Sequence, residues 1–185
     1  MYLVIGLGNP EEEYNNTRHN MGFNVINKIA KKNEISISRN KFEGLYGDGI
    51  IENNKIMLIK PQTYMNLSGK SIKQYIDFYK IDIDDIIVIY DDIDIDTGVI
   101  KIRKNGGPGT HNGMKSVVHE LGTDQFARIR VGIGAPKYDE DLINYVIGHI
   151  PEEEKEILDK GVEQASEAVI EIIKNGIECA MNRFN

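Results

Sequence analysis

The chain has 185 residues, of which 41% are hydrophobic and 28% charged, with a formal net charge of −7. This length suits one domain with its own core, and the composition excludes a disordered or low-complexity chain. The single cysteine, Cys179, excludes an intramolecular disulfide and a cysteine-only metal cluster. The first apolar run, residues 2–7, lacks the length and basic flank of a secretion signal. We therefore expect a cytoplasmic protein.

The charge is unevenly distributed along the chain. Residues 97–119 contain no acid, whereas acids predominate in residues 152–178. A basic surface of this kind can steer a phosphate ligand, but on charge alone two ordinary solvated faces explain the pattern equally simply. The basic residues within residues 97–119 and shortly after them are Lys101, Arg103, Lys104, Lys115, Arg128 and Arg130.

In the first half of the chain, residues 2–7 predict a buried strand that breaks at the turn formed by residues 6–10. Apolar residues at helical spacing predict a helix over residues 21–30, with His19 just before it and Asn20 as its cap. Residues 42–48 and 50–60 predict two strands with a turn at residues 53–54. A loop over residues 62–67 leads into a helix that Ser68 is expected to cap.

In the second half, the β-branched run of residues 86–90 predicts a central strand covered on both faces, with Asp91 at its carboxyl end. Strands are also predicted over residues 99–103 and 126–133, and helices over 111–121, 142–150 and 152–174. Strands that alternate with helices predict a single three-layer α/β/α domain, residues 1–185, with a twisted mixed, mostly parallel sheet. The strands ending near Asn9 and Asp91 are expected to be near neighbours that share one crevice.

Several common active-site motifs are missing. The turn at residues 6–10 lacks the third glycine of a dinucleotide fingerprint, and there is no phosphate loop, nucleophile elbow or zincin pair. The aspartates at positions 91, 92, 94 and 96 could chelate a cation, but strand alternation would split them between two faces. His119 and His149 are expected at the surface.

His19 and His111 differ from the other histidines because each precedes an asparagine at a predicted helix start. Capping and turn formation explain such asparagines simply. If their loops converge, however, neutral amides suit an ester or amide substrate. The residues alone thus support a weak hydrolase hypothesis. The asparagines concerned are Asn9, Asn20, Asn66 and Asn112.

Six blocks, in the same order and over nearly the whole chain, resemble bacterial-type peptidyl-tRNA hydrolase. They are residues 6–10 with Tyr14, residues 17–22 (TRHNMG), 60–69 (KPQTYMNLSG), 91–94 (DDID), 109–116 (GTHNGMKS) and 128–134 (RIRVGIG). The chain departs from the family pattern at Gly109-Thr110, where two glycines are common, and at Asp96-Thr97, where proline is usual. Arg103 also stands where lysine is often found.

The resemblance implies hydrolysis of the ester between a peptide and the 3′ end of tRNA, which recycles tRNA from stalled translation. His19 would activate a water molecule as general base, and Asp91 would orient its imidazole. The substrate is implied to be peptidyl-tRNA, contacted at its acceptor stem and 3′ end by a monomer without metal, cofactor or membrane. The implied contacts are Asn9, Asn66 and Asn112 for the adenosine, peptide and oxyanion, Tyr64 and Met65 for the groove, Arg103 and Arg130 for the 5′-phosphate, and Tyr14 as a further substrate-binding residue.

Two other functions remain open at this point. One is an RNA-binding protein of the same fold that has lost hydrolysis, against which the intact His19 and Asp91 argue. The other is a peptidase or small-ester hydrolase with a histidine-activated water, against which the basic stretch argues.

Overall fold

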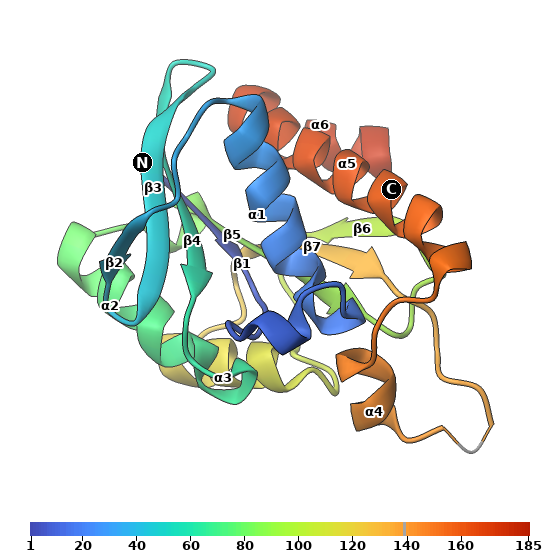
Figure 1. Ribbon diagram of the computed structural model, residues 1–185. Coiled ribbons are helices and arrows are strands. Elements are labelled where there is room, and N and C mark those ends of the chain that lie inside the picture. Colours follow the sequence, from blue (N-terminus) through green and yellow to red (C-terminus); the bar gives the residue numbers. More distant parts are fainter. Residues whose placement is uncertain (139) are drawn as a thin grey trace.

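The computed structural model describes residues 1–138 and 140–185. Within them, seven strands form one sheet in the order β2-β3-β4-β1-β5-β7-β6 (Figure 1). The central strands β4, β1, β5 and β7 are parallel, and the antiparallel pairs lie at the two edges. The predicted mixed sheet is confirmed. The bounds are β1 (Tyr2–Gly6), β2 (Arg39–Lys41), β3 (Gly44–Ile51), β4 (Asn54–Pro61), β5 (Ile86–Asp92), β6 (Ile100–Arg103) and β7 (Ala127–Gly132).

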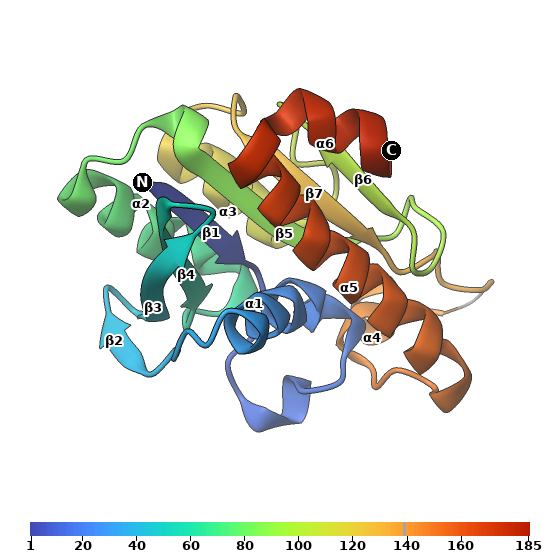
Figure 2. The same cartoon turned by 90° about the horizontal axis from the view of Figure 1, so that it is seen from above.

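Helices cover both faces of the sheet, as predicted. Helices α1 (Met21–Lys32), α5 (Glu152–Asn175) and α6 (Ile177–Phe184) cover one face, and α2 (Ser68–Tyr79) and α3 (Asn112–Leu121) cover the other (Figures 1 and 2). The strands are apolar on both faces because both are buried. In β1, for example, Val4 packs in the core under α1, and Leu3 and Ile5 pack in the core under α2 and α3.

The strands β1 and β5 are parallel neighbours, with Leu3 opposite Ile86 and Gly6 opposite Ile89. Their carboxyl ends therefore meet at one edge of the sheet, as the sequence predicts. The short helix α4 (Leu142–Ile147) lies at this same edge (Figure 1). In the described part of the chain, no helix is both long and apolar enough to cross a membrane.

Helix α1 begins directly against the sheet because two glycines allow it. A Cβ atom at Gly6 would lie 2.2 Å from the carbonyl oxygen of Gly22, and one at Gly22 would lie 2.4 Å from Leu7 N and 2.5 Å from Ile89 O. Those two atoms form a 2.9 Å hydrogen bond that joins the ends of β1 and β5. The close approach places the residues just before α1, including His19, over the carboxyl ends of these strands.

Replacing Gly22 with alanine is expected to lower the free energy of unfolding by about 1–3 kcal/mol, because the new methyl group would overlap backbone atoms. Urea unfolding followed by circular dichroism measures the change. Gly107→Ala is the matched control, because a Cβ there meets nothing within 4 Å. For it we expect a change of less than about 0.5 kcal/mol. Equal stability of both variants would show that α1 can move away from the sheet at little cost.

Two local predictions are wrong, and a third is right in position only. Asn20 is the N-cap residue of α1, but its side chain makes no cap bond because it is hydrogen-bonded to the backbone of Asn9. Ser68 is the first residue of α2, and its hydroxyl donates to Met65 O within the preceding turn. The hairpin turn lies at residues 52–53, one position earlier than expected, where Glu52 and Asn53 both have positive φ. Strand β2 and helix α6 are not predicted from the sequence pattern.

Candidate active site

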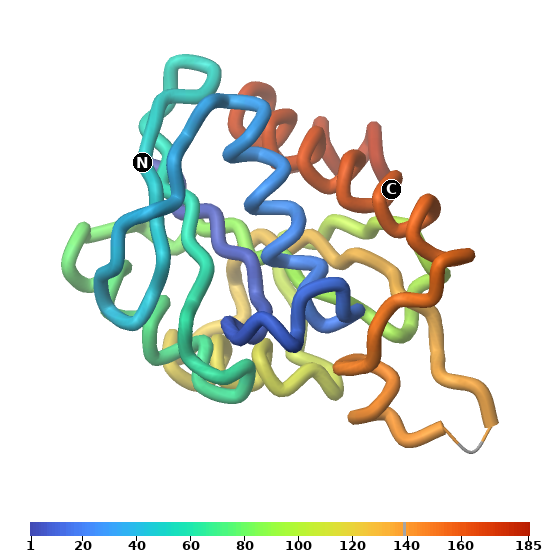
Figure 3. The backbone as a smooth tube through the Cα atoms, viewed as in Figure 1, coloured from blue at the N-terminus to red at the C-terminus, as the bar shows by residue number. Residues whose placement is uncertain are grey.

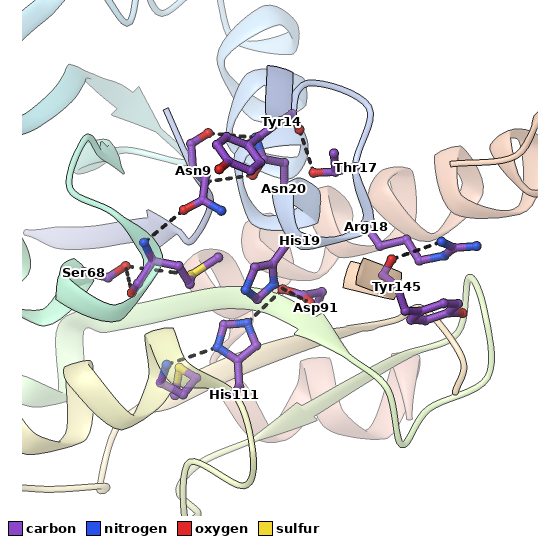
Figure 4. A network of polar contacts seen from close by, with 12 residues as sticks. Asn9, Tyr14, Thr17, Arg18, His19, Asn20, Ser68, Asp91, His111 and Tyr145 are labelled. Carbon is purple, nitrogen blue, oxygen red and sulfur yellow. Dashed lines mark hydrogen bonds and ion pairs between the residues drawn. The ribbon is translucent and has the colours of Figure 1, made fainter. Parts of the chain in front are cut away.

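His19 and Asp91 meet at the carboxyl edge of the sheet (Figure 4). His19 lies in the 3₁₀ turn η2 (Arg18–Asn20), and Asp91 is the penultimate residue of β5. His19 Nδ1 lies 2.8 Å from Asp91 Oδ2, and Asp91 is 2% exposed. A buried carboxylate accepts hydrogen bonds, so Nδ1 carries the hydrogen and Nε2 of His19 is left with a free lone pair.

A second histidine, His111, contacts the other oxygen of Asp91. Its Nε2 lies 2.8 Å from Asp91 Oδ1, and the two histidine rings are 4.9 Å apart. The backbone N–H of Met114 donates to His111 Nδ1 over 3.2 Å, which caps α3. A backbone N–H can donate only to a nitrogen without hydrogen, so the ring hydrogen of His111 must be on Nε2. His111 is thereby fixed as a donor to Asp91, and the carboxylate is held from both sides.

The charges within this cluster shift two pKa values. Burial acts to raise the pKa of Asp91, but the neighbouring imidazoles of His19 and His111, with their hydrogen bonds, hold it well below its ordinary range. Asp91 is therefore ionised at neutral pH. Burial acts to lower the pKa of His19, but the charge and hydrogen bond of Asp91 outweigh it and raise this pKa above its ordinary value.

A cavity lies beside these three side chains. Its polar lining residues come from η2, from the end of β5 and from the glycine-rich loop before α3, and α4 contributes a wall of apolar side chains. Such a cavity, with a few converging polar groups, is the usual form of a small-molecule or reactive site. Its lining residues are His19, Tyr90, Asp91, Asp92, Ile93, Asp94, Pro108, Gly109, Thr110, His111, Asn112, Leu142, Ile143 and Val146.

Asn9 is held in place by two other segments. The side-chain amide of Asn20 accepts from Asn9 N (2.8 Å) and donates to Asn9 O (3.0 Å), and Asn9 Oδ1 accepts from Met65 N (3.0 Å) (Figure 4). The oxygen of the Asn9 side chain is therefore occupied, and its Nδ2 hydrogens are the free donors. Asn9 is 7% exposed.

The remaining predicted contacts lie around this edge with different degrees of exposure. Asn112 is exposed and lines the cavity at the start of α3. Asn66 is exposed in the turn η3 (Met65–Leu67), next to the residue that Asn9 contacts. Tyr64 is 57% exposed just before that turn, and Tyr14 is half-buried at the end of η1 (Glu12–Tyr14).

Four basic residues share one face of the edge strands. Strands β6 and β7 are antiparallel, with Lys101 opposite Arg130 and Arg103 opposite Arg128, so all four side chains point the same way. Like charges opposite each other are destabilising unless something compensates them. Arg130 donates to Asp92 Oδ2 (3.1 Å), and the buried Arg128 donates to the carbonyls of residues 106 and 124. Arg103 is exposed and uses only Nη1, which donates to Ile102 O (3.3 Å), so its other guanidinium hydrogens can meet an anion.

Two residues of the site have roles that the sequence does not indicate. His111 stands out in the sequence without a role, because its bonds to Asp91 and Met114 exist only in the fold. Arg128 is only a basic residue in the sequence, whereas in the structure it anchors the glycine-rich loop. His19, Asp91 and His111 also offer three possible metal-ligand atoms within 4.8 Å of one another. His19 and His111 each direct one ring nitrogen, Nδ1 and Nε2 respectively, to the Asp91 carboxylate. The cluster is therefore arranged for hydrogen bonding.

Peptidyl-tRNA hydrolases appear in each of three comparisons with known proteins. Residues 3–185 match the family described as peptidyl-tRNA hydrolase. Curated peptidyl-tRNA hydrolases from Clostridium botulinum (strain Eklund 17B / Type B) and Caldanaerobacter subterraneus subsp. tengcongensis are 53% and 50% identical, over all of this chain and 96% and 100% of theirs. A crystal structure of peptidyl-tRNA hydrolase from Acinetobacter baumannii has a TM-score of 0.94 and 36% identity, covering 100% of this chain and 94% of that one.

Proposed function

The chain belongs to the peptidyl-tRNA hydrolase family and is a hydrolase, and we propose that it cleaves the ester between a peptide and the 3′ end of tRNA with a water molecule activated by His19. The observation that carries this mechanism is the 2.8 Å contact between His19 Nδ1 and Asp91 Oδ2 beside the cavity. Because Nδ1 faces Asp91, the lone pair of His19 Nε2 points away from Asp91, and a water molecule on that side can donate a hydrogen bond to Nε2.

In this mechanism, His19 takes a proton from water as the water oxygen attacks the ester carbonyl carbon. The resulting imidazolium is stabilised by the ionised Asp91, whose orientation His111 fixes. The bond between the carbonyl carbon and the ribose oxygen then breaks, and the proton on His19 passes to that leaving oxygen. The products are tRNA with a free 3′ hydroxyl and a peptide carboxylic acid, which ionises to the carboxylate by releasing the second water proton to solvent. No redox step or covalent enzyme intermediate is needed.

Neutral amides would hold the rest of the substrate end. The free Nδ2 hydrogens of Asn9, and the exposed amides of Asn66 and Asn112, can donate to the terminal adenosine, the peptide backbone and the developing oxyanion without adding charge. In this proposal Tyr14 and Tyr64 lie beside the groove that receives the substrate end. We assign these contacts as part of the proposal, on the basis of their positions around the same sheet edge.

The basic face of β6 and β7 would bind the acceptor stem, with Arg103 and Arg130 at its 5′-phosphate. Arg103 is exposed, and Arg130 is held in place by Asp92. A guanidinium can bind phosphate through two parallel hydrogen bonds. In this proposal the protein acts as a cytoplasmic monomer of one domain, without metal or cofactor, and recycles tRNA from stalled translation.

One assay with three substrates tests the substrate class. We expect hydrolysis of N-acetyl-aminoacyl-tRNA, and little or none of free aminoacyl-tRNA or of a simple peptide ester. Binding of tRNA without cleavage of the first substrate would identify an RNA-binding protein. Rapid cleavage of the simple ester would identify a small-ester hydrolase.

Replacing Arg103 and Arg130 together with glutamine is expected to weaken tRNA binding and to reduce the slope of log K against log salt by about one to two units, because two phosphate contacts are lost. Filter binding of uncharged tRNA over a range of salt concentrations measures the slope. Lys160→Gln is the control, since Lys160 is an exposed cation on α5 that pairs with Glu156. A slope that is unchanged in the double variant would place the phosphate contacts elsewhere.

A further inference from the structure

Arg18 is adjacent to His19 in sequence, but its side chain points away from the reactive groups (Figure 4). It is 6% exposed and donates to both carboxylate oxygens of Glu154 over 3.0 to 3.2 Å. Its Nη1 also donates to the carbonyl oxygen of Tyr145 (3.2 Å), and its guanidinium lies 4.0 Å from the centre of the Tyr145 ring. One side chain thus joins η2, α4 and the first turn of α5.

Apart from Arg18, the core contacts of Tyr145 and of the half-buried Val146 hold helix α4. It is six residues long, and its buried residue is Tyr145. A helix of this length is not stable by itself in water, so tertiary contacts determine where it sits. Beyond the contacts with Arg18, the Tyr145 hydroxyl donates to Ile133 O (2.6 Å). Tyr145 is therefore tied through its hydroxyl to the residue just after β7, and through its ring face and backbone carbonyl to Arg18.

The segment after α4 is tied to the same loop as Arg18. Ile150 N donates to Asn16 O (2.9 Å), and Thr17 and His149 form an isolated β-bridge. Figure 3 shows the chain before α1 running beside the chain between α4 and α5. The loop that carries His19 and the helix that forms the apolar cavity wall are consequently parts of one connected unit.

The apolar side chains that α4 presents to the cavity are Leu142, Ile143 and Val146. They face the same space as His19 and Asp91. We propose that Arg18 is a positioning residue: through Glu154 and Tyr145 it holds α4 at a fixed distance from His19, so that this wall binds the acyl side chain next to the ester. The inference rests on the proposed function and adds a specificity element to it.

The test uses Glu154→Gln and Arg18→Lys. The first removes the ion pair while keeping the shape of a half-exposed side chain, and the second keeps the charge but loses the planar fork. Glu163→Gln is the matched control: Glu163 also lies on α5 and pairs with the α1 residues Lys28 and Lys32, but it does not line the cavity.

Two measurements are needed on each variant. Hydrogen exchange of the Tyr145 amide, which donates to the carbonyl oxygen of the α4 cap residue Asp141, reports whether the helix is held. We expect exchange about tenfold faster in Glu154→Gln and Arg18→Lys, and unchanged in Glu163→Gln. We expect KM for N-acetyl-phenylalanyl-tRNA to rise about five- to tenfold with kcat within about twofold, because positioning for binding is lost and the chemistry is not. N-acetyl-glycyl-tRNA should be much less affected.

The outcomes separate this inference from the proposed function. Unchanged exchange in both variants, or faster exchange with an unchanged preference for phenylalanyl over glycyl substrate, overturns the role of Arg18. A fall in kcat for both substrates with constant KM also overturns it, because Arg18 would then act through His19. The exchange measurement needs no activity, so failure of the wild-type protein to cleave either substrate would refute the proposed function alone.

Discussion

Replacing His19 with alanine is expected to lower kcat for N-acetyl-aminoacyl-tRNA by about 10² to 10⁴, the usual contribution of a positioned general base. Asp91 and His111 should remain in place, because His19 lies at the end of the hydrogen-bonded series that runs from Met114 N through His111 and Asp91. We therefore expect the affinity for uncharged tRNA to stay within about threefold of wild type. Single-turnover kinetics and filter binding measure the two quantities separately.

The matched control is His119→Ala. His119 is an exposed histidine on α3, and it lies outside the cavity lining. Its replacement should change neither kcat nor tRNA affinity. If the His19→Ala protein kept more than about a tenth of the wild-type kcat, the loss would be too small for a general base, and another group would have to activate the water.

The pH dependence follows from the same group. The pKa of His19 is raised above its ordinary value of 6.5. The neutral imidazole that the mechanism needs therefore predominates only at a pH above this raised pKa. As pH falls through this raised pKa, His19 is protonated and kcat/KM should fall in proportion, with a slope of about one in the logarithmic plot. Asp91 stays ionised throughout this range because its pKa is lowered.

Much of the architecture could be predicted from hydrophobic patterning. The apolar runs at residues 2–7 and 86–90 indicate central strands, and the structure pairs them as parallel neighbours. The elements that escape prediction carry weak patterns. Strand β2 is three polar residues that pair with β3 at the sheet edge. Helix α6 follows Gly176, whose positive φ turns the chain back after α5 rather than ending the helical region.

The site could be predicted in its components but not in its connections. The resemblance indicates His19 and Asp91, and the structure brings them to hydrogen-bonding distance. Asn20 has the local features of a helix cap, yet its amide is used on the backbone of Asn9 because β1 and α1 are packed so closely. Local sequence cannot reveal that choice, since it depends on which polar groups the tertiary fold leaves unpaired.

The fixed orientation of His111 leads to an expectation for Asp91→Asn. His111 must donate from Nε2, so the new amide would turn its oxygen toward His111 and its NH₂ group toward His19 Nδ1. His19 would then carry its hydrogen on Nε2 and could not accept a proton there. We expect kcat to fall by about 10³ to 10⁴, comparable to the loss from the wrong tautomer in a serine-protease triad. The acid limb of the pH profile should also move below 6.5, because burial then lowers the pKa of His19 without opposition.

A second substitution distinguishes this explanation from simple loss of charge. In the double variant His111→Phe/Asp91→Asn the ring is kept against Tyr90, but the donor to residue 91 is removed. The new amide is then free to turn its oxygen toward His19 Nδ1, which restores the productive tautomer. We expect the double variant to be about tenfold more active than Asp91→Asn alone, although His111→Phe by itself should reduce kcat by removing a bond to Asp91. Activity in the double variant no higher than in Asp91→Asn would mean that the wrong tautomer of His19 does not explain the loss, and that the missing negative charge of Asp91 does.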